Sequence, residues 1–404
     1  MSIYLSVTAF LLFRLFRNLY FHIAVTVPFF ISQGLSLSQI FALESIYYVF
    51  KVIADVPAGA FADNFSKRLS VALSGFVASA GYILMASSDS IIGFAIAQTI
   101  LGIAVALFSG ADSTAILDVL QKAGKDHLYP RIESMGWVAR NLGFGAAAII
   151  GGYIAAIYGA GITWYCTAVC VFISGLLILL LPDDRQITEI TERRSTWKLL
   201  GQVASFMRTD LFVAGVLIYF AAVFSLVRIG LWYMQPMAAN MGLDVSMNGV
   251  LFAASIVISI LFGALTSSLF PISRLSRTLI VVTTGGILFP IFWALAANSQ
   301  QYYVVWAYFM LGLFLFGSLQ GIYDPIAKIW VAARIPSDIR TTVLSAGSLI
   351  ANLVFACIGP ISGYLADTYG ISNALIIMSI LHAVPMSIAS IFLIRFQRSV
   401  ERSL

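Results

Sequence analysis

Residues 134–155 read SMGWVARNLGFGAAAIIGGYIA, and residues 345–366 read SAGSLIANLVFACIGPISGYLA. Aligned at an offset of 211 residues, the two stretches are identical at nine of 22 positions. Several of these matches are Gly, Asn or Tyr, which an apolar background seldom pairs by chance. The chain therefore contains an internal repeat, and the fold should consist of two similarly built halves.

The rest of the chain is a series of apolar runs. Its 404 residues are 60% hydrophobic and 10% charged, with a mean hydropathy of +0.95, whereas soluble proteins are about 45–50% apolar and about 25% charged. This composition excludes a soluble enzyme, a disordered chain and a disulfide-stapled secreted domain. Twelve runs are each close to the ~20 residues that span a bilayer: 5–30, 39–61, 70–87, 90–112, 131–157, 161–181, 211–236, 246–269, 278–297, 302–323, 341–363 and 371–394.

An apolar run without strand-like alternation is expected to cross lipid as a helix, because lipid offers the backbone no hydrogen-bond partners. We therefore expect an all-α membrane protein with 12 transmembrane helices. The longest polar stretch divides it into an N-terminal six-helix half, 1–182, a central loop, 183–210, and a C-terminal six-helix half, 211–404. Parallel repeats of this kind are typical of one large group of secondary transporters.

The positions of lysine and arginine predict the topology. With a cytoplasmic N-terminus, the inner loops and the C-terminal tail hold 18 of the 23 basic residues, and the outer loops hold none. Basic residues collect on the cytoplasmic side, so we expect both termini and the central loop to be cytoplasmic. The net charge of +5 is spread over short loops, which argues against nucleic-acid binding.

The loop between the second and third runs carries a motif. Residues 59–68, GAFADNFSKR, resemble the signature loop of the major facilitator superfamily: Gly, three residues, Asp, a basic residue, any residue, Gly and two basic residues. Two positions depart from it, Asn64 and Ser66. The whole chain is similar to the bacterial 12-helix efflux-type branch of that superfamily, which implies a 6+6 pseudo-twofold fold and alternating access. The matching positions, and therefore the predicted gating residues, are Gly59, Asp63, Lys67 and Arg68.

In that family, Asp63 would cap the N-terminus of the eleventh helix, near Thr341 and Thr342, while the cytoplasmic side is closed. A carboxylate in such a place contributes about 0.3–1 kcal/mol. Opening the inner side would break this contact, so the loop is predicted to act as a latch. The alternative is a plain cytoplasmic turn whose basic residues only set the orientation.

Two further family patterns are partial. Efflux members often carry Gly-Pro-x-x-Gly-Gly in the fifth helix, with a further Gly four residues earlier; here Gly143, Gly151 and Gly152 fit, but the Gly-Pro pair is missing. Many proton-coupled drug exporters carry an Arg four residues before a Gly in the fourth helix, and here Gln98 precedes Gly102. The first pattern favours export, and the second argues against the usual drug–proton exchange.

Ionisable residues inside the runs are the candidate functional groups, because such a group costs about 2.5–3.5 kcal/mol in lipid. On a continuous helix the polar residues of the first run share one side, as do those of the second run. The predicted substrate-binding residues are Arg14, Arg17, Asn18, Arg140, Arg228, Trp232 and Tyr233; the predicted proton-coupling residues are Glu44, Asp55, Asp112 and His22; Lys51 joins the gating set.

Structural alternatives exist for several of these residues. Arg14 could extend to the headgroups, and Lys51 could form an i,i+4 ion pair with Asp55 that only holds the second helix in place. Asp112 could balance Arg140 or Arg17. If it does, Asp112 stays charged and is structural, whereas a buried and poorly paired carboxyl suits proton coupling.

The balance of buried charge points to the substrate. Five cations lie inside the runs, against three acids that we expect to be buried, Glu44, Asp55 and Asp112, and two at the edge of the membrane, Asp118 and Asp324. Arginine forks match carboxylate and phosphate. We therefore expect an anionic or zwitterionic substrate, such as a carboxylate-type siderophore or a similar metabolite, exported in exchange for protons.

Other functions have less support. The sequence lacks HExxH, a Gly-x-Ser-Gly site and a Walker loop, so we expect no enzyme, no metal and no cofactor. A multidrug exporter of lipophilic compounds, a lipid flippase or a non-transporting sensor remain as alternatives. The expected partners are the lipid bilayer, a small-molecule substrate and protons. The expected state is a monomer, multi-pass in the cytoplasmic (inner) membrane of a bacterium, with no cleaved N-terminal segment.

Overall fold

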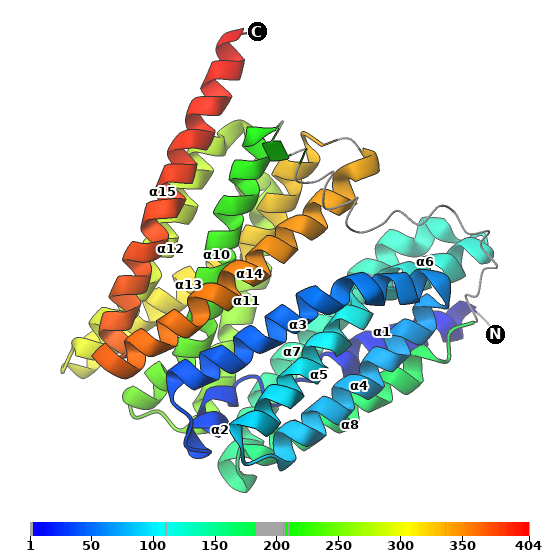
Figure 1. The fold of residues 1–404 in the computed structure, drawn as a ribbon, viewed down its shortest axis with the longest axis horizontal. Helices are drawn as coiled ribbons and strands as arrows, with labels where there is room; N and C mark the ends of the chain where they lie inside the picture. Colours follow the sequence, from blue (N-terminus) through cyan, green and yellow to red (C-terminus); the bar gives the residue numbers. More distant parts are fainter. Residues whose placement is uncertain are drawn as a thin grey trace. The chain divides into compact units, whose positions relative to one another are not determined.

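The computed structural model is built of α-helices and two short 3₁₀ turns (Figure 1). It describes residues 3–109, 111–182, 205, 207–208, 210–335 and 337–403. The elements are α1 (Ile3–Arg17), α2 (Thr26–Ser32), α3 (Leu37–Asn64), α4 (Lys67–Ser87), α5 (Ile91–Phe108), α6 (Ala111–Lys122), η1 (Asp126–Leu128), α7 (Tyr129–Tyr158), α8 (Gly161–Ile178), α10 (Leu211–Asn240), α11 (Val245–Leu269), η2 (Ile272–Arg274), α12 (Leu275–Asn298), α13 (Tyr302–Ala332), α14 (Ser337–Tyr369) and α15 (Ile371–Ser403).

Eleven stretches of this described part are long and apolar enough to cross a membrane. The prediction of an all-α membrane protein is confirmed. Most predicted runs become one helix each, extended by a few polar residues, and the run 90–112 continues past Phe108 into α6. Side chains at the start of several helices satisfy free backbone N–H groups: Ser66 accepts from Leu69, Ser90 from Gly93, and Asp210 from Phe212 and Val213.

The first run is not one helix, contrary to the prediction for 5–30. The helix α1 ends at Arg17 and α2 begins at Thr26. Side chains take the place of backbone hydrogen bonds that a continuous helix would make here. Asn18 Nδ2 donates to the Arg14 carbonyl at 2.8 Å, and the Phe21 N–H donates to Thr167 Oγ1 at 3.1 Å. The predicted stripe of Arg14, Arg17, Asn18 and His22 on one helix side is therefore wrong for its last two members, which lie in the break.

The described residues form two compact units. Unit 1 comprises Met1–Leu35, Leu43–Thr191 and Leu243–Ala253, and unit 2 comprises Ser36–Ala42, Glu192–Gly242 and Ala254–Leu404. The first residues of α3 thus belong to unit 2, and the first residues of α11 belong to unit 1. The predicted central loop lies outside the described residues over 183–204.

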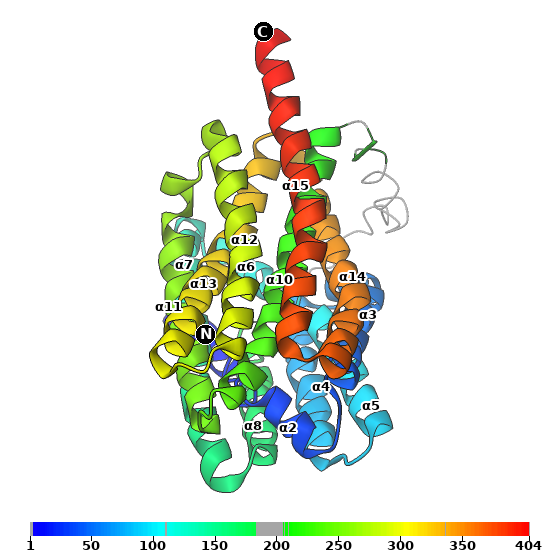
Figure 2. The ribbon, with the colours of Figure 1, turned by 90° about the vertical axis from the view of Figure 1, so that its left-hand side faces the viewer.

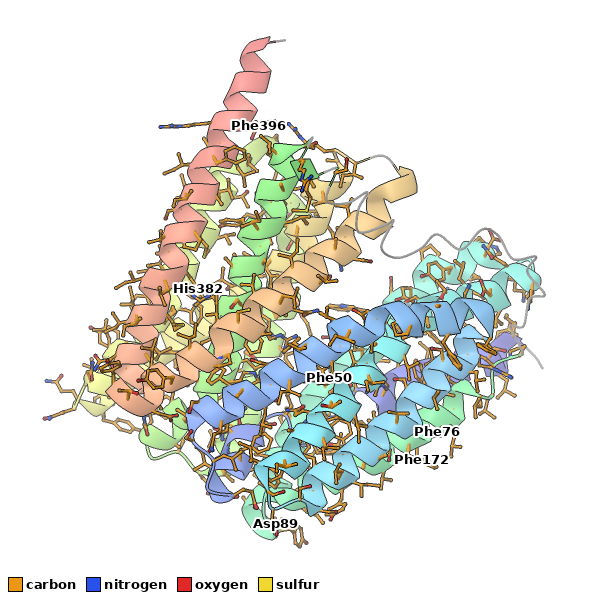
Figure 3. All side chains as sticks on the ribbon, in the orientation of Figure 1. Phe50, Phe76, Asp89, Phe172, His382 and Phe396 are labelled. Carbon is orange, nitrogen blue, oxygen red and sulfur yellow. The ribbon has the colours of Figure 1, made fainter. Side chains whose placement is uncertain are left out.

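In unit 1, α4 and α8 pack very closely. A side chain on Gly75 would meet the Gly175 backbone at 2.9 Å, so only glycine permits this approach. Next to the glycines, the rings of Phe76 and Phe172 lie side by side with centroids 5.1 Å apart (Figure 3). In unit 2, α10, α12 and α15 run together (Figure 2), and Trp293 of α12 donates to the Phe309 carbonyl of α13 at 3.1 Å.

The internal repeat appears as equivalent contacts. Within unit 1, a Cβ on Gly152 of α7 would meet the Ser246 carbonyl oxygen at 2.6 Å. Within unit 2, a Cβ on its repeat partner Gly363 of α14 would meet the Leu37 carbonyl oxygen at 2.6 Å. Each glycine thus lets its helix touch the first turn of another. The two helices also end alike, at glycines with φ of +88° and +82°: Gly159 and Gly370.

Unit 2 adds a carboxylate cap to this arrangement. Asp367, one turn beyond Gly363, accepts from the backbone N–H of Leu37 at 2.9 Å and of Ser38 at 2.8 Å. The carboxylate satisfies two free donors at the N-terminus of α3 and lies at the positive end of that helix. Asp367 therefore ties the start of α3 to the end of α14.

We expect Asp367→Asn to lower the free energy of unfolding by about 0.5–2 kcal/mol. Asparagine offers one acceptor oxygen and no charge where the carboxylate accepts two N–H groups. Thermal unfolding of the detergent-purified protein measures the change. Asp89→Asn, the same substitution in the exposed loop before α5, is the control. Identical unfolding midpoints for the two variants would contradict the capping role.

Candidate functional site

In unit 1, Arg14 connects three helices. Its Nη2 lies 2.9 Å from Asp112 Oδ2 and 2.9 Å from Glu133 Oε1, and it donates to Ser113 Oγ at 2.8 Å. Arg14 and Asp112 are both buried. Asp112 thus forms its ion pair with Arg14, a cation that was not considered for it from the sequence, and it also interacts electrostatically with Arg17 and Arg140. Such an arrangement holds α1, α6 and α7 together.

One turn further along α1, Arg17 lies in different surroundings. Its side chain is buried, with 2% of the residue exposed. It donates to the Tyr20 hydroxyl, and its guanidinium carbon lies 5.1 Å from the centre of the Phe108 ring. Within the described part of the chain no carboxylate lies within 4.0 Å of it, and its Nε makes no hydrogen bond. Arg17 is therefore a buried guanidinium with donors to spare.

Glu44 lies in the same region of unit 1. The residue is 7% exposed, and its Oε1 accepts from Gln98 Nε2 at 2.9 Å. Gln98 fills the position of the arginine that drug exporters carry, and here it supplies a neutral donor to an acid. Tyr82 interacts electrostatically with both Arg17 and Glu44. The structure thus brings together an acid, a guanidinium and a tyrosine from α3, α1 and α4.

The other acid of α3, Asp55, interacts electrostatically with Lys51, as the i,i+4 spacing predicted. Both residues are half-buried. Asp55 Oδ1 makes no hydrogen bond among the described residues. The Lys51–Asp55 interaction fits a gating or structural ion pair better than a binding site.

The break between α1 and α2 positions His22. Its ring stacks on Trp164 of α8 with centroids 4.0 Å apart, and its Nδ1 lies 3.1 Å from Thr167 Oγ1. Tyr20 and Tyr82 complete an aromatic cluster around it, with centroids 5.7 Å and 5.0 Å from His22. The other predicted residue of the break, Asn18, bonds to the α1 backbone.

The remaining predicted binding residues are separate from this group. Arg140 of α7 is exposed and interacts electrostatically with Asp112. In unit 2, the Arg228 guanidinium carbon lies 5.3 Å from the centre of the Phe224 ring. Trp232 is buried, and its indole N–H makes no hydrogen bond among the residues described for unit 2. The Tyr233 hydroxyl donates to the Ser362 carbonyl at 2.6 Å, within the contact between α10 and α14.

The predicted gating loop is described in part. Lys67 forms an ion pair with Asp118 of α6 at 2.7 Å, and Arg68 donates to the Leu181 carbonyl at 2.6 Å. Gly59 lies exposed on α3. The side chains of Asp63, Thr341 and Thr342 lie outside the described residues, so the predicted latch stays a prediction.

Sequence reasoning missed four residues of unit 1. Glu133 stands at the polar start of α7, where it resembles an ordinary loop acid, and Ser113 only follows Asp112. Tyr20 and Tyr82 are hidden among the many aromatic residues of the runs. One signal was available for Glu133: it is a carboxylate about two turns before Arg140 on the same run.

Comparisons with known proteins agree with this architecture. The structure of the nucleoside transporter NupG matches with a TM-score of 0.79 and 18% identity, over 98% of this chain and 99% of that one. A bacterial homologue of the human lysosomal transporter Spinster, in an inward-facing and occupied conformation, matches with a TM-score of 0.68 and 15% identity, over 98% and 96%. These identities establish the fold alone. No curated protein shows a significant match.

The family model described as Major Facilitator Superfamily matches residues 7–313, well over half of the chain. The resemblance inferred from residues 59–68 and from the repeat is confirmed. The chain is a multi-pass membrane protein, and its relatives are transporters of small molecules rather than enzymes. It belongs to the Major Facilitator Superfamily.

Proposed function

We propose that this transporter exports a zwitterionic or anionic organic solute in exchange for protons, by alternating access of two six-helix halves. The proposed setting is the cytoplasmic membrane of a bacterium, with a monomeric protein whose termini are both cytoplasmic. The single observation that carries the proposal is Arg17. A guanidinium 2% exposed, without a carboxylate within 4.0 Å in the described part of the chain, supports recognition of an acid group on the substrate.

Arg14 makes the argument specific. Two arginines lie one turn apart on α1, and one of them is already matched by Asp112 and Glu133. Burying a second guanidinium without such a match is costly. That cost is offset when a carboxylate or phosphate of the substrate accepts hydrogen bonds from the Arg17 guanidinium.

Charge balance favours a zwitterion over a simple anion. When Glu133 is added to the acids that were predicted inside the apolar runs of unit 1, four acids instead of three stand against the four cations predicted inside those runs. They are Arg14, Arg17, Lys51 and Arg140 against Glu44, Asp55, Asp112 and Glu133. A substrate with both signs of charge preserves that balance when it binds.

The position of Glu44 supports exchange with protons. We propose that Arg17 holds the acid group of the substrate while Glu44 holds its cationic group. Glu44 can also take a proton, and then it no longer attracts a cation. Proton and substrate therefore exclude each other at this carboxyl, as exchange requires. We propose Glu44 ahead of Asp112 and Asp55 as the carrier, because Asp112 lies 2.9 Å from the Arg14 guanidinium and Asp55 interacts electrostatically with Lys51.

For unit 2, we propose a separate group of substrate contacts. The Trp232 indole is a buried donor without a bond in the described residues, and Arg228 offers a further cation. Buried indole N–H groups normally have a hydrogen-bond partner, so we propose that an acceptor on the ligand is the partner of the Trp232 N–H. Tyr233 is proposed only to shape this region, since Ser362 takes its hydroxyl hydrogen.

We expect Arg17→Gln to raise the half-saturation concentration for a zwitterion by about 10- to 100-fold, since a hydrogen bond to a charged group contributes about 1.5–3 kcal/mol. Transport would be measured in inside-out and right-side-out vesicles with an imposed pH gradient. The labelled probes are carnitine as a zwitterion, citrate as a polycarboxylate, a nucleoside and a cationic dye. The exposed Arg131→Gln on the first turn of α7 is the control.

Each outcome separates the candidate functions. Carnitine or citrate movement that collapses with the gradient and with Arg17→Gln supports the proposal, and vesicle orientation reports the direction. Transport of the dye at an unchanged rate in Arg17→Gln and Arg228→Ala would contradict the proposal and indicate a multidrug exporter. Nucleoside movement alone would contradict the proposal and indicate a nucleoside transporter, as NupG is.

A further inference from the structure

Thr167 of α8 is the one side chain that bonds to two residues of the break in the described structure. Its Oγ1 lies 3.1 Å from the Phe21 backbone nitrogen and 3.1 Å from His22 Nδ1. Its own hydrogen points to the Thr163 carbonyl, with an O–O distance of 2.9 Å, as is usual for a helical threonine. Every polar atom of Thr167 is therefore committed.

This commitment determines the form of the neutral histidine. A hydroxyl has one hydrogen, and Thr163 receives it, so Thr167 can only accept from Nδ1 of His22. Nδ1 must therefore carry the imidazole hydrogen. Nε2 is then left as an unprotonated acceptor, and it makes no hydrogen bond among the described residues.

The His22 ring and the proposed acid-binding residue, Arg17, have a common neighbour. Tyr20 links the two, because its hydroxyl accepts from Arg17 while its ring meets His22 edge-on at 5.7 Å. Trp164 stacks on one face of the imidazole, and the Tyr82 ring packs against it with centroids 5.0 Å apart, so we take the ring edge as the part that meets a ligand. The break thus places the His22 ring and the Arg17 guanidinium against the same tyrosine.

We infer that His22 accepts a hydrogen bond from the substrate through Nε2, that Thr167 positions it for this role, and that the substrate carries a hydroxyl or N–H donor near its acid group. The inference rests on the proposed function and names the substrate class more narrowly. It assigns His22 to substrate selection, in place of the proton-carrier role predicted from the sequence.

Two zwitterions that differ by one hydroxyl test the inference. Carnitine carries a hydroxyl near its carboxylate, and its 3-deoxy analogue γ-butyrobetaine does not. We expect the wild-type protein to prefer carnitine in half-saturation concentration by about 3- to 10-fold. The variant His22→Asn, whose amide reaches only the Nδ1 position, should abolish the preference. His22→Gln, whose amide reaches the Nε2 position, should retain most of it.

Variants of Thr167 separate positioning from direct contact. Thr167→Val removes the hydroxyl at constant shape and should reduce the preference, whereas Thr167→Ser should restore it. The exposed His127→Gln is the control. The inference would be overturned if His22→Asn kept the preference for carnitine, whether or not His22→Gln lost it. That result would make Nδ1, not Nε2, the important atom.

The tautomer can be read without transport. The chain has three histidines, so nitrogen NMR of the histidine-labelled protein in detergent, assigned with His22→Gln, reports which nitrogen of His22 bears hydrogen. We expect a protonated Nδ1 and a bare Nε2 at neutral pH. A protonated Nε2 would overturn the inference. Transport of neither zwitterion would instead contradict the proposed function, and with it the substrate assigned to His22.

Discussion

Gly151→Ala should be among the most destabilising single-methyl changes in this chain. Gly151 of α7 faces the break in the first crossing, and a Cβ built on it overlaps the Phe21 carbonyl oxygen and lies 2.7 Å from the carbonyl carbon. The obstacle is backbone, so no rotamer change relieves it. We expect a loss of about 3 kcal/mol or more, seen as a thermal midpoint lowered by roughly 5–10 °C.

Gly145→Ala provides a control on the same helix. In the described structure a Cβ on Gly145 meets nothing within 4 Å. Alanine is also the better helix former by about 0.5–1 kcal/mol, so this variant should be as stable as the wild-type protein or slightly more so. Equal thermal midpoints for Gly151→Ala and Gly145→Ala would show that Gly151 is not in close contact with the Phe21 backbone.

The crossing helices could be predicted because their signal is local. An apolar run of about 20 residues needs no knowledge of its neighbours to be assigned, and the repeat at 134–155 and 345–366 is visible in the letters. The break after Arg17 has no such signal. It depends on Thr167, about 150 residues away, which takes the Phe21 N–H. No Pro or Gly marks it, because 18–25 contains neither.

The candidate site was predictable as a set of residues but not as a set of pairs. Arg14 and Arg17 look alike in sequence, since each is an arginine in one apolar run. Their difference comes from α6 and α7, which bring Asp112 and Glu133 to Arg14. Spacing along a helix predicts partners on that helix only, which is why Lys51 and Asp55 were found and Glu133 was missed.

Arg14 and Arg17 should therefore respond oppositely to one substitution. Arg14→Gln leaves Asp112 and Glu133 together without their cation, and breaking such a buried arrangement costs about 3–5 kcal/mol. Arg17→Gln removes a buried charge that has no carboxylate within 4.0 Å in the described residues, so its unfolding free energy should be unchanged or higher. Stability would be compared by thermal unfolding of the three proteins in the same detergent.

The triple variant Arg14→Gln, Asp112→Asn, Glu133→Gln shows whether charge is the cause. Neutral amides of similar shape can hydrogen-bond to one another, so most of the stability lost in Arg14→Gln should return. Glu133 is a third exposed, with 33% of its side chain accessible, so Asp112 should carry most of the penalty. Were Asp112 the proton carrier and neutral at rest, Asp112→Asn alone would cost nothing and Arg14→Gln little. A large loss in Arg14→Gln with recovery in the triple variant would identify the Arg14 cluster as structural and leave proton exchange to Glu44.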